Sequence, residues 1–380
     1  MASATGSRGP AKKPNKVSSA RTKRKMVVFV IEVIIILGMI GVLYYVMKHT
    51  QTTDDEGPIY ADVGDLSPSD IGISDSVLRS SDGGAMDGYT NIALFGVDAL
   101  SSKGSDLLRG YRSDTIMIAS INNATGEVTL VSVYRDTYLN LGNDSYNKCN
   151  AAYAKGGATQ AVTMLNANLD LNITNWVTVS YKALATVIDD LGGIMIDVES
   201  NEIDHLNNYQ IAVAQAIGIS EDNITPVRET GYQLLNGMQA AAYCRIRYTD
   251  GNDFKRTERQ REVLEAILKE AQTRDAATLT SIFTDVMNYT YTSFDEKTLL
   301  DMVLNVKDYK VVRDGGFPSM DMMAGANLRT YGDCVVPTNL EDNVIWLHEY
   351  LFNDRNYVPS DQVKAFSAYI EAETENYIRK

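Results

Sequence analysis

The pattern of apolar and polar positions divides the chain into five stretches. Residues 1–25 are polar and basic, and residues 26–47 are almost continuously apolar. Residues 48–88 are acidic and rich in Ser, Gly and Asp, with few large apolar side chains. From residue 89 to 358 short apolar runs alternate with amphipathic segments, and residues 359–380 read as a polar, helical C-terminal tail. The pattern therefore predicts one folded domain over 89–358, separated from an apolar segment by an extended linker.

Residues 26–47 are long enough to cross a bilayer as a helix. The stretch 26–46 reads MVVFVIEVIIILGMIGVLYYV, and Glu32 is its one charged residue. At ~1.5 Å per residue it spans a hydrocarbon core of ~30 Å. A cleaved signal peptide is the competing interpretation, but the run is long and no small-residue cleavage site follows it. We expect an uncleaved transmembrane helix.

Charge is distributed unequally about this segment. Residues 1–48 hold nine of the 35 Lys and Arg and one of the 49 Asp and Glu, so the remainder holds 26 bases and 48 acids, a net charge of −22. The excess of Lys and Arg before residue 26 predicts a cytoplasmic N-terminus and an extracellular domain on a single-pass cell-membrane protein. So acidic a domain is a poor general binder of nucleic acid, and none is expected as a partner.

Short apolar runs bounded by turn residues predict the strands of the domain. They lie at 91–97, 115–121, 128–134, 176–180 and 194–198. Helices are predicted over 150–169, with Gly156 and Gly157 as a weak point, and over 182–191. This alternation predicts an α/β fold, an α-β-α sandwich with a central mixed β-sheet, preceded by the transmembrane helix.

Charged residues stand where predicted strands end. Asp98 directly follows one strand, Asp114 precedes another behind Arg112, and Arg135 follows a third. Ligands of α/β proteins gather at such positions, because loops at strand ends present polar groups on a rigid frame.

The densest signal is the stretch 243–260, which reads YCRIRYTDGNDFKRTERQ. Arg245 and Arg247 alternate at strand spacing and would share a face, and Asp253 is a plausible N-cap of a helix from residue 254. On that helix Arg256 and Gln260 continue the stripe that faces the core.

Two interpretations of these arginines remain open at this point. Inward-facing arginines on an acidic domain suit an anionic ligand, since the guanidinium group binds phosphate with two parallel hydrogen bonds. Structural ion pairing is the alternative, and a solvated helix face does describe Arg261 with Glu265. Two acids at strand ends with several arginines suggest Mg²⁺ together with a phosphate or pyrophosphate.

Six stretches in order resemble the LytR–CpsA–Psr family of Gram-positive cell-envelope proteins. They are FGVD at 95–98, RSDTIM at 112–117, SVYRDT at 132–137, YNKCNAAY at 146–153, DDLGGI at 189–194, and 243–260 with the turn before it. The resemblance implies a phosphotransferase that moves a glycopolymer from a polyprenyl-pyrophosphate carrier to peptidoglycan. The polymer would be a wall teichoic acid, a capsular polysaccharide or a related secondary wall glycan. A pyrophosphatase acting on the carrier, or a non-catalytic lipid-phosphate-binding scaffold, are the alternatives.

The resemblance also assigns roles to residues. Asp98 and Asp114 would hold Mg²⁺ (or Mn²⁺), and Asp253 is either a base or a structural cap. The groups expected to grip the pyrophosphate are Arg135, Arg245, Arg247, Arg256 and Gln260, with Arg112 and Lys148 as further members of that shell. Catalysis would rest on Asp98, Asp114, Arg135, Arg245, Arg247 and Asp253. An apolar channel for the prenyl chain is expected between sheet and helices.

The chain departs from the family pattern at two positions. Ala99, Leu100 and Ser101 follow Asp98 where the family often has an arginine, and Tyr134 replaces the usual proline before Arg135. Separately, Cys149 and Cys244 lie inside the resembling stretches. An extracellular disulfide between them and two buried free thiols are both consistent with the sequence.

Overall fold

The computed structural model describes residues 59–61, 66–81, 84–97, 107–108, 110–247 and 252–378. The expected transmembrane helix, the basic tail before it and Asp98 lie outside these residues. Within them, no helix is both long enough and apolar enough to cross a membrane. The described residues belong to one compact unit that begins at residue 56.

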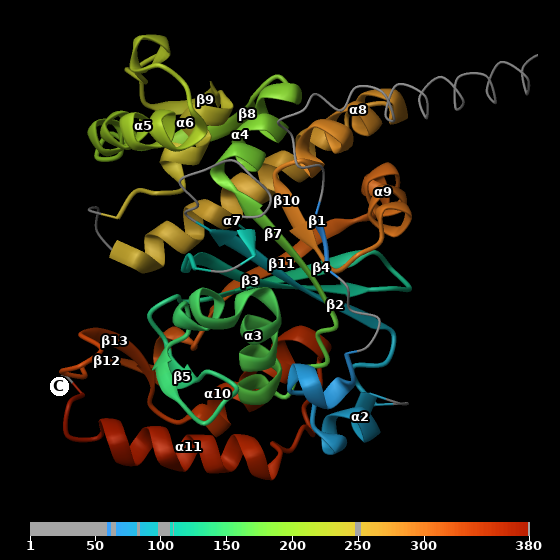
Figure 1. Cartoon of the computed structure of the whole chain (residues 1–380), viewed down its shortest axis with the longest axis vertical. Helices are drawn as coiled ribbons and strands as arrows, with labels where there is room; N and C mark the ends of the chain where they lie inside the picture. Colours follow the sequence, from blue (N-terminus) through green and yellow to red (C-terminus); the bar gives the residue numbers. More distant parts are fainter. Residues whose placement is uncertain are drawn as a thin grey trace, which may run out of the picture. The chain divides into compact units, whose positions relative to one another are not determined.

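A seven-stranded sheet forms the centre of this unit (Figure 1). Its strands, in spatial order, are β1 (Ile59–Tyr60), β10 (Thr290–Thr292), β7 (Asn175–Ser180), β2 (Tyr89–Val97), β3 (Ser113–Asn122), β4 (Glu127–Val133) and β11 (Lys310–Phe317). The pairs β1–β10, β7–β2 and β4–β11 are parallel, and the other three are antiparallel. The predicted central mixed sheet is therefore confirmed.

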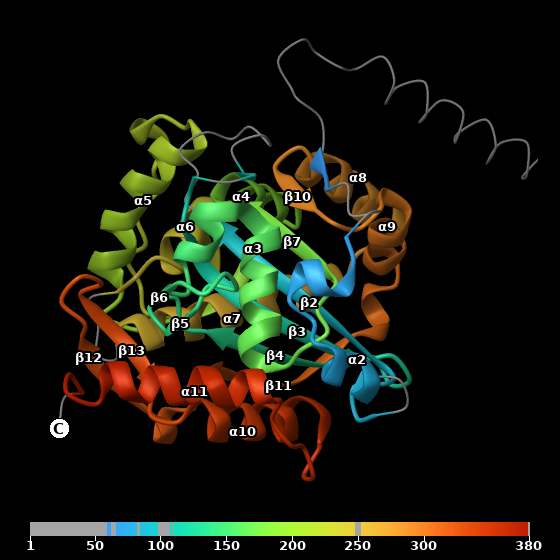
Figure 2. The ribbon, with the colours of Figure 1, turned by 60° about the horizontal axis from the view of Figure 1, so that its bottom comes forward.

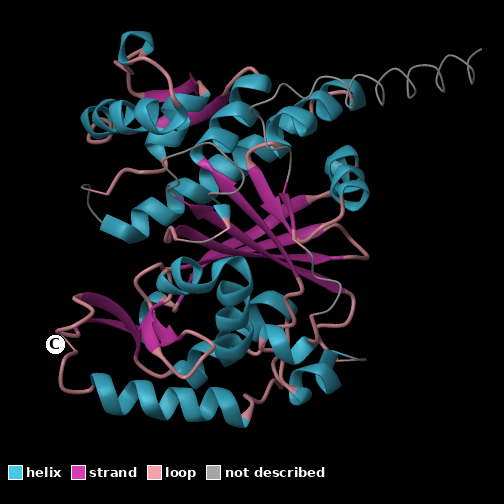
Figure 3. Ribbon diagram, in the orientation of Figure 1, coloured by secondary structure: helices cyan, strands magenta, loops and turns pink. Residues whose placement is uncertain are grey.

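Helices cover both faces of the sheet, as Figures 1 and 3 show. One face carries α3 (Ala151–Leu169), α10 (Leu340–Phe352) and α11 (Asp361–Thr374), and the other carries α4 (Tyr181–Asp190), α7 (Asn252–Ala271), α8 (Ala276–Met287) and α9 (Glu296–Leu304). The strands alternate accordingly. Ala93 and Phe95 of β2 face the α3 side, whereas Ile92 and Leu94 face the α7 side.

The chain between α4 and α7 builds a smaller layer of its own. Strand β8 (Ile194–Val198) pairs with β9 (Gly231–Leu235) and not with the central sheet. Helices α5 (Ile203–Ile217) and α6 (Gly237–Tyr243) pack against each other and against α4. The predicted strand at 194–198 is therefore confirmed, but it belongs to a separate hairpin.

The remaining elements are short. Two further hairpins are β5 (Tyr138–Asn140) with β6 (Tyr146–Lys148), and β12 (Met323–Asn327) with β13 (Asp333–Pro337). Helix α2 (Asp75–Ser81) and short 3₁₀ turns at Pro68–Ile71, Glu221–Asn223, Val306–Asp308 and Met320–Met322 complete the described elements.

Helix α3 is interrupted where its glycine pair predicts a weak point. Gly156 and Gly157 leave the helical conformation, and Gly157 has φ 68°. A side chain at Gly157 would also run into the backbone carbonyl of Leu108. The interruption therefore serves a close approach between α3 and the chain before β3.

The C-terminal segment is part of the folded unit, contrary to the prediction of a polar tail from residue 359. Ser360 caps α11 and also binds the carboxylate of Asp170. Val363 and Ile370, one on each side of the helix centre, are fully buried in the main core. Figure 2 shows α11 beside α3, with which it is in contact. Phe366 also packs against this core, so α11 docks through one apolar face although much of its surface is polar.

Candidate functional site

Asp114 lies at the start of β3 and is surrounded by arginines. Its carboxylate oxygens accept hydrogen bonds from Arg135 at 2.8 Å and from Arg247 at 3.1 Å. Arg256 reaches the same residue from α7, and its Nη2 donates to the backbone carbonyl of Asp114 at 2.7 Å. Three segments that are far apart in the sequence therefore meet at one end of the sheet.

Asp253 lies on the other side of these arginines. Its Oδ1 atom is 3.3 Å from Arg135 Nε and 3.3 Å from Arg256 Nη1. Helix α7 begins at Asn252, so Asp253 stands inside its first turn and is not the predicted N-cap. Both carboxylate oxygens are buried and, among the described residues, accept no hydrogen bond. We call Asp114, Asp253, Arg135, Arg247 and Arg256 the arginine cluster.

Lys148 extends the arginine cluster towards the β5–β6 hairpin. Its Nζ atom is 3.2 Å from the carboxylate of Asp136, which is 3.7 Å from Arg135 Nε. Sequence reasoning included Lys148 but omitted Asp136. The signal was available, because Asp136 directly follows Arg135 at the end of β4.

The segment with Arg245 and Arg247 is a turn, and the prediction of a strand there is wrong. Helix α6 ends at Tyr243, after which the amides of Arg245 and Ile246 bind back to the two preceding carbonyls of that helix end. Arg247 reaches Asp114, whereas the guanidinium carbon of Arg245 lies 4.8 Å from the ring centroid of Tyr181. The two arginines therefore contact different groups.

Helix α7 presents Arg256 and Gln260 to the interior, as its periodicity predicts. Arg256 is 1% exposed, and Gln260 is also buried and donates to the carbonyl of Cys244. The interpretation of Arg261 as a solvated residue is wrong, because it is buried and its Nε binds Asp314 at 2.6 Å. Asp314 is on β11, far along the chain, so no local pattern indicated this pair.

Sequence reasoning missed the buried ion pair of Arg259 and Glu202. Arg259 Nε binds the Glu202 carboxylate at 2.6 Å, and each side chain is 2% exposed. Arg259 also donates to the backbone carbonyl of Ile246, the residue between Arg245 and Arg247. This pair therefore fixes the backbone that carries both arginines.

The charges of the arginine cluster shift one another's protonation. Burial raises the pKa of Asp114, but Arg135, Arg256 and Arg247 together outweigh it and hold that pKa below its ordinary value. Burial lowers the pKa of Arg256, and the neighbouring Arg135 and Arg247 lower it further against the pull of Asp253 and Asp114. An anion entering here would relieve repulsion among three guanidinium groups.

Two residues that the sequence predicted for the site, Arg112 and Asp98, are not part of the arginine cluster. Arg112 is exposed and has no ion-pair partner within the part of the chain that the structure describes. Asp98 follows the last residue of β2, Val97, which pairs with Ser113 beside Asp114. The register therefore brings the end of β2 next to Asp114, although Asp98 itself is not described.

An apolar cavity adjoins the arginine cluster. It has a volume of about 260 Å³ and lies between strands β2, β3 and β7 and helices α4 and α7. Its walls are mostly aliphatic, including Met117, Val179 and Val263. Thr115 and Gln260 line it, and each is close in the chain to a member of the arginine cluster. An amphipathic ligand with an anionic head would meet both surfaces at once.

The residues fit one part of a Mg²⁺ site. Among the described residues no group of three or more His, Cys, Asp or Glu could hold a metal. Mg²⁺ needs less, since one or two carboxylates, substrate phosphate oxygens and water complete its shell. Asp114 fits one such ligand, because its low pKa keeps it ionised and its oxygens retain further lone pairs.

The three cysteines are buried free thiols in the structure. Cys149 Sγ donates to the backbone carbonyl of Tyr134 at 3.2 Å, and Cys244 lines the apolar cavity. Of the two alternatives left open by the sequence, the structure has the thiols and not the Cys149–Cys244 disulfide.

Comparison with known proteins identifies the family. Residues 44–328 match the model of the LytR_cpsA_psr family. The chain belongs to this family. The resemblance of the sequence motifs is thereby confirmed.

Several relatives in this family have descriptive names. Biofilm regulatory protein A of Streptococcus mutans is 32% identical over 194 residues, which cover 49% of this chain and 45% of that protein. The polyisoprenyl-teichoic acid–peptidoglycan teichoic acid transferase TagU of Enterococcus faecalis is 32% identical over 182 residues, which cover 47% of this chain and 52% of TagU. The alignments with these two relatives span about half of the relatives' length.

Solved structures of the family share the fold. TagT with bound octaprenyl pyrophosphate lipid aligns with a TM-score of 0.51 at 19% identity, covering 70% of this chain and 92% of TagT. TagT bound to LI-WTA aligns with a TM-score of 0.55 at 20% identity, and the alignment covers 72% of this chain and 93% of TagT.

Proposed function

We propose that this protein transfers a glycopolymer from a polyprenyl-pyrophosphate carrier to peptidoglycan. The observation that carries the proposal is the apolar cavity directly beside the arginine cluster. Cationic groups suit a pyrophosphate head, and an adjoining aliphatic cavity suits the first units of a prenyl chain. A relative in the family is named a teichoic acid transferase, and a solved structure with this fold has octaprenyl pyrophosphate bound.

In the proposed reaction, an acceptor hydroxyl attacks the phosphorus that carries the glycan. A new P–O bond forms to the acceptor, the P–O bond to the lipid phosphate breaks, and polyprenyl phosphate leaves. The hydroxyl proton passes to a base or to solvent. Arg135, Arg247 and Arg256 neutralise charge that develops on the phosphate oxygens, and their fixed positions avoid reorganisation during the reaction.

Asp114 and Asp253 have different roles in this proposal. Asp114 holds Arg135 and Arg247 in place and, with Asp98, would ligate Mg²⁺ or Mn²⁺. The divalent ion, when bound, supplies further charge neutralisation on the phosphate oxygens. Asp253 binds Arg135 and Arg256, so we assign it to positioning these two side chains. Arg245, Gln260, Lys148 and Arg112 would contact the donor around this centre.

The proposed location follows from the same chemistry. The expected transmembrane helix would hold the domain at the extracellular face of the membrane, where a lipid-linked donor presents its head group. A tether of this kind raises the effective concentration of the domain at that surface. The glycopolymer would be a wall teichoic acid, a capsular polysaccharide or a related wall glycan.

The test uses the full chain in detergent micelles with Mg²⁺, a prenyl-pyrophosphoryl oligosaccharide and peptidoglycan oligomers, with products read by mass spectrometry. We expect glycan on peptidoglycan, and a loss of about 100-fold or more in Arg135→Ala, because one preorganised charge contact contributes ~10²–10³ in rate. Arg355→Ala is the matched control, since Arg355 is 83% exposed and pairs only at the surface with Glu349.

Other outcomes identify the alternatives. Lipid phosphate released without transfer, and abolished in Arg135→Ala, would replace the transferase with a carrier pyrophosphatase. Tight binding of octaprenyl pyrophosphate without turnover of any donor would indicate a scaffold. A Val263→Phe variant reduces the cavity, so weaker donor binding in this variant would support the assignment of the cavity to the prenyl chain.

A further inference from the structure

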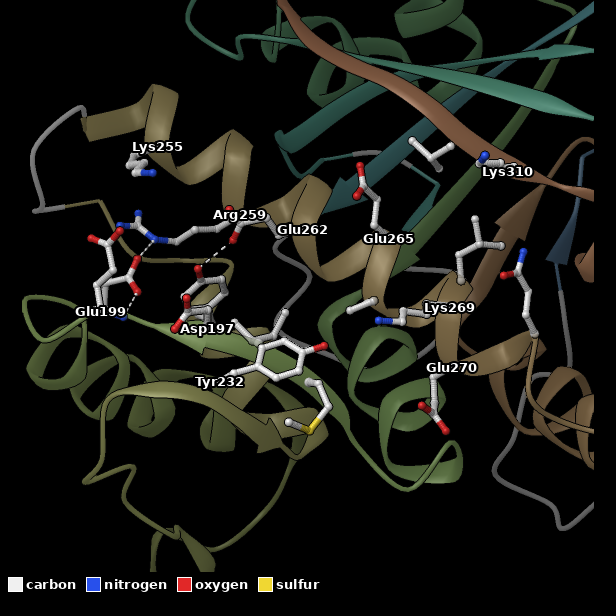
Figure 4. A pocket seen from close by; sticks show the side chains of 18 of the residues that line it. Asp197, Glu199, Tyr232, Lys255, Arg259, Glu262, Glu265, Lys269, Glu270 and Lys310 are labelled. Carbon is white, nitrogen blue, oxygen red and sulfur yellow. Dashed lines mark hydrogen bonds and ion pairs between the residues drawn. The ribbon is translucent and has the colours of Figure 1, made fainter.

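A second, larger hollow lies on the other side of α7 (Figure 4). It is a groove of about 720 Å³ between α7, the β8–β9 hairpin and the start of β11. None of its lining residues is part of the arginine cluster. We call it the α7 groove.

Tyr232 is the most prominent side chain of the α7 groove. It is 62% exposed, and Figure 4 shows its ring in the middle of the groove. Strand alternation brings it to the outward face of the hairpin, where it stands opposite Asp197 of β8. An exposed aromatic ring beside a carboxylate suits a sugar, because the ring packs on the apolar face of a pyranose and the carboxylate accepts from its hydroxyls.

The charge of the lining argues against a polyanionic ligand. The lining has four Lys or Arg and six carboxylates, which are Asp197, Glu199, Glu202, Glu262, Glu265 and Glu270. Arg259 is neutralised by Glu202 within the wall of the groove. The remaining excess is negative and would repel a chain of phosphates, whereas it provides acceptors for hydroxyl or amide groups.

The α7 groove and the arginine cluster share a wall. Lys255 and Arg259 line the groove, and Arg256 between them along α7 belongs to the cluster. The hydrogen bond from Arg259 to the Ile246 carbonyl joins the floor of the groove to the segment that carries Arg247. A chain lying along the groove could therefore continue to the reacting phosphate around the first turn of α7.

We propose that the α7 groove binds an uncharged oligosaccharide stretch of one of the two substrates. This inference rests on the proposed function, and the groove would position either the glycan of the donor or that of the acceptor. Both candidate ligands, the glycan of the donor and that of the acceptor, would present the groove with a chain of pyranose rings without phosphate. The experiment separates the two sources.

The binding test uses the full chain in detergent micelles and the β-1,4-linked hexamer of N-acetylglucosamine as the probe, measured by titration calorimetry. Tyr232→Ala should weaken binding about five- to ten-fold, the loss expected for one aromatic contact. Leu234→Ala is the matched control, because Leu234 is on the same strand, is 59% exposed and does not line the groove. A neutral ligand also predicts a change below about two-fold between 50 and 500 mM salt.

Several results would overturn the inference. They are equal binding by wild type and Tyr232→Ala, equal loss in Leu234→Ala, no binding of the hexamer, or preferred binding of polyglycerol phosphate. The Arg135→Ala variant separates this inference from the proposed function. It should bind the hexamer with the affinity of the wild type but should lose affinity for inorganic pyrophosphate. The binding role of the α7 groove and that of the arginine cluster can therefore be refuted independently.

Turnover then separates the two sources. If the groove holds the acceptor, Tyr232→Ala raises the KM for peptidoglycan oligomers and leaves the KM for the lipid-linked donor unchanged. If it holds the donor's glycan, the reverse is expected. Unchanged KM values for both substrates would contradict a role of the groove in the reaction.

Discussion

Arg259 Nη1 donates a hydrogen bond of 3.1 Å to the backbone carbonyl of Ile246. Ile246 is fully buried, and its neighbours Arg245 and Arg247 point to Tyr181 and Asp114. Because Arg259 is itself held by Glu202, the positions of two proposed substrate-binding arginines depend on an ion pair outside the arginine cluster.

Glu202→Gln tests this dependence. The substitution leaves the Arg259 charge buried without a counter-charge, which should cost about 3–5 kcal/mol of unfolding free energy. We also expect weaker binding of inorganic pyrophosphate, because the 244–247 segment loses its anchor. Denaturant unfolding and calorimetry measure the two effects. Glu258→Gln is the control, since Glu258 forms an exposed pair with Lys255 and should cost less than about 1 kcal/mol. Equal effects of the two variants would refute the positioning role.

Asp114→Asn should destabilise the protein in a pH-dependent way. The arginines hold the folded-state pKa of Asp114 below its ordinary value of 3.8, so the ionised carboxylate stabilises the fold. That contribution is complete above about pH 5 and is lost as the pH falls through the lowered pKa. At neutral pH we expect the free energy of unfolding of the wild type to exceed that of the variant by about 2 kcal/mol, which is the contribution of a charge-assisted hydrogen bond. Thermal unfolding of both proteins from pH 7 to pH 3 should show the difference shrinking at the acidic end. A difference that grows on acidification would contradict this account.

His348 should make stability fall in mild acid. Its ring is buried, stacks on Tyr357 at 3.6 Å between centroids and contacts the carbonyl of Leu169. Burial lowers its pKa from 6.5 to about 4, so the unfolded chain binds a proton more readily than the folded one in that interval. The contribution of His348 to the free energy of unfolding is therefore fully present above about pH 6.5. It is lost as the pH falls towards 4, and the loss is at most ~3 kcal/mol. His348→Gln should be less stable at pH 7 and show a flatter profile. Parallel pH profiles of the two proteins would rule out this contribution.

The cysteines should be unreactive in the folded protein. All three thiols are buried, and burial raises the pKa of Cys244 to about 12 and that of Cys334 to about 11. Since the thiolate is the reactive form, a maleimide should label few of them in native protein at pH 7.5 and all three after denaturation without reductant. Mass spectrometry counts the labels. Recovery of a Cys149–Cys244 disulfide from non-reduced protein would contradict the structure at this point.

Local sequence patterns were sufficient where one element alone determines the outcome. Short apolar runs bounded by turn residues predicted β2, β3, β4 and β7, because a strand that is covered on both faces is apolar at successive positions. The Gly156–Gly157 interruption in α3 and the inward stripe of Arg256 and Gln260 followed from the same kind of reasoning. The order of motifs also indicated the family, which the match over residues 44–328 confirms.

Local patterns failed where a distant partner determines the environment. Arg261 looked like a solvated residue, but its side chain is buried and binds Asp314, which is 53 positions away in the chain. The spacing of Arg245 and Arg247 resembled a strand, but α6 ends at Tyr243, and within the residues that the structure describes no strand pairs with this segment. Both errors have the same cause, since hydrogen-bond partners are not a property of the segment itself.

The sequence by itself therefore determined the alternation of strands and helices, the sign of the charge in each region and the residues available for phosphate chemistry. Only the tertiary structure decided that Arg135, Arg247 and Arg256 meet at Asp114, that an aliphatic cavity lies beside them, and that a groove of opposite charge character runs along the other side of α7. Periodicity is set by near neighbours in the chain. A site is set by which surfaces the packed sheet and helices bring together, and that depends on contacts over the whole domain.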